Sequence, residues 1–322
     1  MNCSMLPSML VAETELRDGD GILIIGAEGS PGRHIASALM RMGQRILLQL
    51  SKAQSAEAMK PLNTEIIRTE TEIPMLEEII AAKREFTSLI IAPSLHLSTG
   101  QNLSSQHLMH LQKLLADFDA KMPEVQKWVL LSQYQSDTSS EQLFQCSKNT
   151  HWLICPLVIG FRDQNLLDEM MLPLKEQRSL KFQAAGTFED LNMVFASDVA
   201  AVTIAALRKG PGPQQIIRIT ENVTGLPSLI LQFQKSMNEK TGASWSDFLS
   251  KALFSKNQPI GSRISISESK TLAATLQFKN MPRAEEIFPN SPTKPERFFK
   301  QIKEFWKRDP KLELHFPPSR AP

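Results

Sequence analysis

A glycine-rich turn between two apolar patterns is the stretch of this sequence with the clearest chemical meaning. Gly26, Gly29 and Gly32 follow the apolar run Ile22–Ile25 and precede a helical pattern. We expect Gly26 to allow a tight turn, Gly29 to let backbone N–H groups approach a pyrophosphate, and Gly32 to let the helix pack close to the strand. The turn predicts a dinucleotide site at a helix N-terminus; the alternative is a glycine-rich turn without a ligand. Its predicted binding residues are Gly26, Gly29, Ser30, Pro31, Gly32 and Arg33.

The end of the next apolar run, Ile46–Leu50, indicates which dinucleotide would bind. An Asp or Glu at this place would hold the ribose 2′-hydroxyl of NAD. The chain has Ser51 and Lys52 instead, and Arg33 follows the last glycine. Because a hydroxyl and two cations suit a 2′-phosphate, we predict NADP as the cofactor, with NAD as the alternative. The competing interpretation is that both cations are solvated surface residues.

Two further strand ends supply candidate cofactor contacts. Ala92, Pro93 and Ser94 end the fourth apolar run, where the chain should pass beside the cofactor ribose; an ordinary loop is the alternative. Glu70 follows the third run, at the place where related folds have an acidic residue near the adenine. A solvated loop carboxylate is an equally good interpretation of Glu70.

The end of the fifth apolar run carries two groups that exchange protons. Ser132 and Tyr134 follow Trp128–Leu131 at the carboxyl edge, where ligands bind in parallel sheets. They are the candidate catalytic residues, and Tyr134 would donate a proton to a substrate. The alternative for Tyr134 is a partly buried tyrosine whose hydroxyl is hydrogen-bonded within the protein.

We predict no metal site. His107 and His110 stand at i, i+3 on a helical pattern, but no third ligand accompanies them. The cysteines, Cys3, Cys146 and Cys155, are odd in number and not closely spaced, which argues against a disulfide framework or a zinc site. Cys155 lies in an apolar run and is predicted to be a core residue.

The elements that must position these residues alternate along the chain. The predicted strands are Ile22–Ile25, Ile46–Leu50, Glu65–Arg68, Ser88–Ala92, Trp128–Leu131 and Trp152–Cys155. Helical patterns at Met75–Lys83 and Gln106–Phe118, and after the glycine turn, separate several of them. This alternation predicts an α/β fold, a Rossmann-type doubly wound parallel sheet with strand order 3-2-1-4-5-6.

The regular alternation weakens after Pro156, which predicts a smaller C-terminal substrate lobe. Strands are expected at Asn192–Phe195 and Gln215–Ile219, and a helix over Val199–Leu207 with Ser197 or Asp198 as its N-cap. Further helical patterns and short strands are expected at 141–147, 166–174, 182–184, 226–241, 268–276 and 295–306. The predicted organisation is a flexible N-terminal arm (1–18), a Rossmann core (19–160), a C-terminal lobe with elements returning to the core (161–308) and a loose tail (309–322).

Composition and charge argue against nucleic-acid and membrane partners. The 322 residues include 36 basic and 34 acidic side chains, a net charge of +2 that gives no sign of nucleic-acid binding. No apolar run approaches the ~18 residues of a membrane span, and the N-terminus is a poor signal peptide, so we predict a cytoplasmic protein with no membrane contact. The pattern at 295–306 predicts an amphipathic helix with a solvated basic face; a partner-binding face is the weaker alternative.

Several stretches, in their order along the chain, resemble the NmrA-like branch of the atypical short-chain dehydrogenase/reductase family, in particular its festuclavine-dehydrogenase-like group. These stretches are Gly26–Gly32, Lys127–Tyr134, His151–Pro156, Phe195–Leu207, Ile219–Gly242 and Pro295–Trp306. The resemblance extends from about Gly21 to Trp306, and only the glycine turn is specific in its chemistry. It implies an NAD(P)-binding Rossmann fold and an oxidoreductase with a small-molecule substrate in a cleft roofed by the C-terminal lobe.

The chain departs from this family at the residues that transfer protons. Typical members carry Tyr-x-x-x-Lys, but here Tyr134, the only tyrosine, has Thr138 at the lysine position. Ser139 stands where NmrA-like reductases often have a lysine. Cys155 replaces the family's Arg, and Ser51 replaces a basic residue at the end of the second strand.

These departures leave two functions open. The first is an NADP(H)-dependent reductase, for which an iminium or activated alkene substrate would need little acid catalysis. The second is a catalytically silent NADP(H)-binding protein that senses cofactor state or scaffolds a protein partner. The missing lysine favours the second function, and the complete glycine turn is compatible with both.

Overall fold

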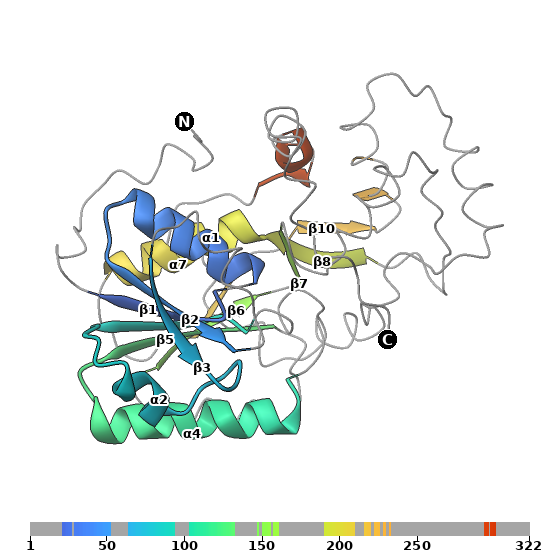
Figure 1. Ribbon diagram of the computed structural model, residues 1–322. Helices are drawn as coiled ribbons and strands as arrows, with labels where there is room; N and C mark the ends of the chain where they lie inside the picture. Colours follow the sequence, from blue (N-terminus) through green and yellow to red (C-terminus); the bar gives the residue numbers. More distant parts are fainter. Residues whose placement is uncertain are drawn as a thin grey trace.

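A parallel β-sheet of seven strands organises the protein (Figure 1). The computed structural model describes residues 21–27, 29–52, 64–93, 103–132, 147, 150–155, 157–160, 190–209, 216–219, 222–225, 228–229, 232, 293–295 and 297–300. The strands are β1 Ile22–Ile25, β2 Ile46–Ser51, β3 Glu65–Thr69, β4 Ser88–Ile91, β5 Gln126–Ser132, β6 Thr150–Cys155 and β9 Ile216–Arg218. Their order is β3-β2-β1-β4-β5-β6-β9. The predicted Rossmann-type α/β fold and the predicted order of the first six strands are confirmed, and β9 extends the sheet beside β6.

Helices cover both faces of this sheet (Figure 1). The helices on one face are α1 Ser30–Arg41 and α7 Ala196–Lys209, and those on the other are α2 Leu76–Ala81 and α4 Ser105–Lys121. Side chains of β1 alternate between the two cores: Leu23 and Ile25 pack with the α2 and α4 side chains, whereas Ile22 and Ile24 pack with those of α1 and α7. Because both faces of the central strands are buried, their sequences are continuous apolar runs.

A second sheet of three strands lies beyond the carboxyl end of β6. Its strands are β7 Leu157–Ile159, β8 Asp190–Phe195 and β10 Asn222–Gly225, in the order β10-β8-β7. β7 pairs with β8 in parallel, and β10 pairs with β8 antiparallel. The sequence predicts β8 in part but neither β7 nor β10.

The start of α7 corrects one prediction. The helix begins at Ala196, so Ser197 and Asp198 lie inside its first turn and neither is the N-cap. Asp198 is buried. Its carboxylate accepts two hydrogen bonds from Thr293, one from the backbone N–H (2.8 Å) and one from the side-chain hydroxyl (2.7 Å). A distant segment of the chain, rather than the local backbone, therefore satisfies this carboxylate.

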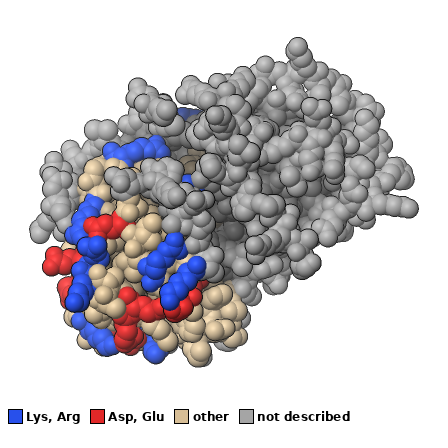
Figure 2. Space-filling view, viewed as in Figure 1, with Lys and Arg blue, Asp and Glu red and all other residues tan. Residues whose placement is uncertain are grey.

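Several predicted features lie outside the described residues. These are the N-terminal arm, the elements expected at 166–174, 182–184 and 268–276, almost all of those at 141–147 and 226–241, and the end of the helix at 295–306. On the face shown in Figure 2, the Lys and Arg side chains of the described residues are interspersed with those of Asp and Glu. None of the helices in the described ranges is long and apolar enough to cross a membrane.

Candidate nucleotide-binding site

The glycine turn packs directly against the end of β4. Gly26 has φ +80°, in the left-handed region that favours glycine, and a Cβ placed on it would lie 2.1 Å from the carbonyl oxygen of Ala92. A Cβ on Gly32 would lie 2.3 Å from the carbonyl oxygen of Gly26. Both glycines therefore have the roles predicted from the sequence. The same contact brings Ala92, another predicted site residue, against the turn.

Helix α1 begins at this turn, and no side chain caps its N-terminus. Gly29 is the N-cap residue, and no side chain caps the helix or places an acidic group in its first turn. The backbone N–H of Arg33 donates to the Gly29 carbonyl at 2.9 Å, and Pro31 has no N–H. The helix itself provides no acceptor for the N–H groups of Ser30 and Gly32. Two amide donors and the positive end of the helix dipole thus favour an anion here.

Among the described residues, the charge in the first turn of α1 is also favourable to an anion. Burial, followed by the nearby charges of Arg33 and Arg41, lowers the pKa of His34 from 6.5 to about 4. His34 is therefore neutral at pH 7, and the Arg33 guanidinium provides the positive charge in the first turn of α1.

The ends of β2 and β3 bring together two predicted residues that the sequence does not pair. Lys52 and Glu70 form an ion pair, and both side chains are largely exposed. The pKa of Lys52 is raised, chiefly by its hydrogen bond to Glu70. Ser51 is buried, and its carbonyl accepts a hydrogen bond from Arg68 at 3.0 Å. The predicted phosphate-binding cation, Lys52, is thus already paired with the carboxylate of the residue that follows β3.

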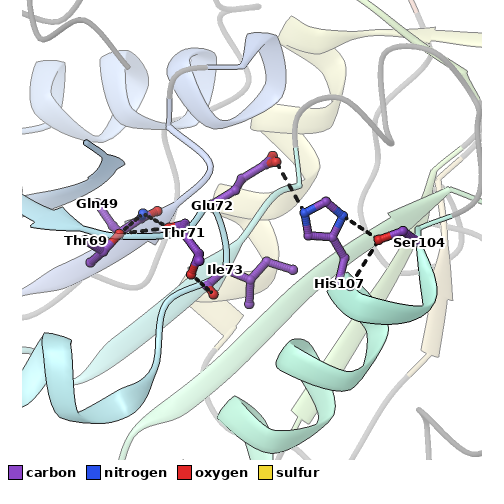
Figure 3. Close-up of polar contacts among 7 residues, drawn as sticks. All are labelled: Gln49, Thr69, Thr71, Glu72, Ile73, Ser104 and His107. Carbon is purple, nitrogen blue, oxygen red and sulfur yellow. Dashed lines mark hydrogen bonds and ion pairs between the residues drawn. The ribbon is translucent and has the colours of Figure 1, made fainter. Parts of the chain in front are cut away.

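A polar network inside the sheet fixes the loop that follows β3 (Figure 3). The buried Gln49 amide donates to the Thr69 hydroxyl at 2.6 Å and to the Thr71 carbonyl at 3.2 Å. The Thr69 hydroxyl donates to the same carbonyl at 2.9 Å, and the Thr71 hydroxyl donates to the Ile73 carbonyl at 2.7 Å. Sequence reasoning missed Gln49; its signal is a single amide within the apolar run Ile46–Leu50.

The start of α4 contacts the same loop from the other side (Figure 3). Ser104 is the N-cap of α4, and its hydroxyl oxygen accepts the backbone N–H of His107 at 3.2 Å. The Ser104 hydroxyl also lies 3.1 Å from His107 Nδ1, while His107 Nε2 lies 4.0 Å from the Glu72 carboxylate. The His107 ring therefore lies between the start of α4 and the β3–α2 loop. No group of three metal-ligating side chains occurs among the residues that the structure describes.

The remaining predicted residues lie at or beyond the carboxyl ends of the strands. Pro93 is buried beside Ala92, and Ser94 and Tyr134 lie outside the described residues. Ser132 ends β5 and is paired in register with Cys155 of β6, so its backbone lies at the expected edge. Cys155 is a buried core residue, as predicted, and burial raises the pKa of its thiol.

Solved structures share this fold over nearly the whole chain. dTDP-glucose 4,6-dehydratase from Bacillus anthracis in complex with NAD has a TM-score of 0.63 at 12% identity, covering 91% of this chain and 98% of that one. UDP-N-acetylglucosamine 4-epimerase from Bacillus cereus has a TM-score of 0.60 at 10% identity, covering 88% and 98%. Leucoanthocyanidin reductase from Vitis vinifera, in binary complex with NADPH, has a TM-score of 0.56 at 14% identity, covering 88% and 99%.

At these identities the similarity establishes the fold. No family model and no curated protein matches the sequence. The resemblance to NmrA-like proteins therefore stays a prediction.

Proposed function

We propose that the protein is an NAD(P)H-binding, NmrA-like oxidoreductase that reduces a small organic molecule by hydride transfer. The observation that carries the proposal is the close packing of the glycine turn: no side chain fits at Gly26 or Gly32, and the uncapped start of α1 lies beside them. This cradle suits a pyrophosphate. Structures of the same fold have been solved in complex with NAD and with NADPH.

The residues of this chain would bind and orient the dinucleotide, and the bound cofactor would supply the hydride. The N–H groups of Ser30 and Gly32 would hold the pyrophosphate, with Arg33 adding a positive charge. Ala92 and Pro93 would line its ribose side. Ser132 and Tyr134 remain the candidate groups on the substrate side.

NADP is the proposed cofactor in preference to NAD. The end of β2 lacks the carboxylate that would hold a ribose 2′-hydroxyl, and it offers the ammonium of Lys52 instead. Water and salt screen a contact between this exposed ammonium and a 2′-phosphate, so the expected preference for NADPH is modest, roughly tenfold.

Gly29→Asp is a direct test of the phosphate site. Gly29 has φ −78° and ψ 164°, which any residue can adopt, and Asp is a favoured N-cap residue. The variant is therefore expected to fold, while its carboxylate repels the pyrophosphate. We expect calorimetry to show NADPH binding weakened by roughly a hundredfold or more.

Gly29→Ser is the matched control, because serine also caps a helix but carries no charge. It is expected to retain more affinity than Gly29→Asp at equal thermal stability. Unchanged NADPH affinity in a folded Gly29→Asp protein would rule out the proposed site.

A second candidate function is a catalytically silent NADP(H)-binding sensor or scaffold. One feature of the sequence favours the silent protein. Thr138 and Ser139 stand where short-chain dehydrogenases and NmrA-like reductases have a lysine. Purified protein with NADPH and a panel of carbonyl, imine and enone compounds separates the two. NADPH oxidation with any member supports the reductase, whereas tight NADPH binding without turnover on the whole panel supports the silent protein.

A further inference from the structure

We propose that Glu70 sets the cofactor preference of this site by competing with a ribose 2′-phosphate for Lys52. The inference rests on the proposed function, because it concerns the adenosine side of the same dinucleotide site. It gives Glu70, directly after β3, a role in cofactor specificity, whereas the sequence indicates only a contact near the adenine for this residue.

The pairing of β2 and β3 creates this competition. Ser51 and Thr69 are partners in register, so the residues that follow them, Lys52 and Glu70, come side by side. The Lys52 N–H donates to the Thr69 carbonyl at 2.8 Å, and the Lys52 ammonium forms its ion pair with Glu70. The side chains are 63% and 66% exposed, so a ligand arriving from solvent can reach both.

Hydrogen bonds hold the backbone of Glu70 as well as that of Lys52. Glu78 on α2 accepts the Glu70 backbone N–H at 2.8 Å with one carboxylate oxygen and the Met75 N–H at 2.9 Å with the other. The Gln49–Thr69–Thr71 network holds the preceding turn. The backbones of Lys52 and Glu70 are therefore both held by hydrogen bonds, and the long, exposed Lys52 side chain can turn from one anion toward another.

A 2′-phosphate at this edge meets an unfavourable arrangement. It must draw the Lys52 ammonium away from Glu70, and it approaches the negative charges of Glu70 and Glu78. The ribose 2′-hydroxyl of NADH carries no charge and needs no such exchange. Glu70 therefore reduces the NADPH preference that Lys52 alone would give.

Glu70→Gln removes the charge and keeps the shape of the side chain. In calorimetric titrations of the full-length protein at low salt, we expect NADPH to bind roughly two- to fivefold more tightly and NADH to bind unchanged. Glu77→Gln is the matched control, since Glu77 pairs with Lys121 at 2.7 Å on the exposed side of α2 and α4. The control is expected to leave both affinities unchanged.

The same titrations in a Lys52→Ala background test the mechanism. There Glu70→Gln is expected to give a clearly smaller gain for NADPH, because the cation for which it competes is gone. A full gain in that background, or an unchanged NADPH-to-NADH ratio in Glu70→Gln itself, would overturn the inference. Failure of the unmodified protein to bind either cofactor would instead refute the proposed function.

Discussion

At the scale of single residues, a buried ion pair stands at the edge of the sheet opposite the proposed site. Lys127, near the start of β5, is completely buried, and its ammonium lies 2.5 Å from the Asp119 carboxylate on α4. The Val125 carbonyl lies 3.5 Å from the same ammonium. Asp119 keeps 26% of its side chain exposed, so only the lysine depends on its partner for solvation.

The two halves of this pair should differ in their effect on stability. Asp119→Ala leaves a buried cation without its counter-charge and should lower the free energy of unfolding by about 2–4 kcal/mol. Lys127→Met removes that charge at similar volume and should cost less, about 1 kcal/mol, because the remaining carboxylate reaches water. Urea unfolding at pH 7 measures both values. A larger loss in Lys127→Met than in Asp119→Ala would contradict this account.

The role of a residue could be predicted from the sequence when its partners lie in the same turn. Gly26 and Gly32 lie in one turn, and their spacing was enough to predict the tight turn and the close approach of the helix; the packing of Gly26 against Ala92 depends on the fold. The Lys52–Glu70 pair required the register between β2 and β3, which the pattern of either strand alone does not contain. Gln49 was missed because an amide inside an apolar run has no local partner; its partners lie on β3 and in the loop after it.

At the scale of elements, α1 is the helix whose ends are best defined by its sequence. Pro31 lies in its first turn, where a missing N–H costs nothing, and Gly43 follows it with φ +77°. The half-buried His34 lies on this helix, and the charges of Arg33 and Arg41 act on it.

His34 should make the protein less stable in mild acid. The pKa of His34 is about 4 in the folded protein and 6.5 in the unfolded chain, so protonation favours the unfolded chain. The free energy of unfolding therefore has its full His34 contribution above pH 6.5 and decreases as the pH falls toward 4. One such group changes the unfolding free energy by at most ~1.4 kcal/mol per pH unit. Urea unfolding at pH 7 and pH 5 measures the effect. Between these pH values the free energy of unfolding should fall less for His34→Gln than for the parent protein.

His110→Gln, on α4, controls for the removal of a histidine elsewhere. It should keep the pH dependence of the parent protein. An equal loss of stability in His34→Gln and the parent between these pH values would show that His34 does not titrate in this way.

Elements were predictable where burial imposed a pattern. Strands covered on both faces, such as β1, gave apolar runs that could be assigned directly. β7 has only the residues Leu157–Ile159 and follows Pro156, so its pattern is too short to separate from β6. β10, Asn222–Gly225, carries little apolar character and depends on antiparallel pairing with β8. The start of α7 was misplaced because the partner of Asp198 is remote in sequence.

At the scale of the whole molecule, a C-terminal segment returns to the core. Phe298 stacks on Phe195 of β8 with ring centroids 3.8 Å apart, and Phe299 meets the same ring edge-on at 6.4 Å. Both phenylalanines are buried in the core that also contains β1 and α4 side chains. Thr293, just before them, provides the two hydrogen bonds to Asp198 on α7.

Asp198 should therefore control how firmly this segment is attached. Asp198→Ala leaves the Thr293 N–H and hydroxyl without their buried acceptor, a loss of ~1–3 kcal/mol that corresponds to roughly ten- to hundredfold faster opening. Hydrogen exchange at the amides of 297–300 should accelerate by this factor, while exchange in β1 and β4 stays unchanged. Thr293→Val, which keeps the backbone donor, should give a smaller acceleration, and Ser197→Ala, one residue from Asp198, should give none. Equal exchange at 297–300 in Asp198→Ala and the parent protein would show that the aromatic contacts to Phe195 alone hold the segment, and that the buried carboxylate is not needed for its attachment.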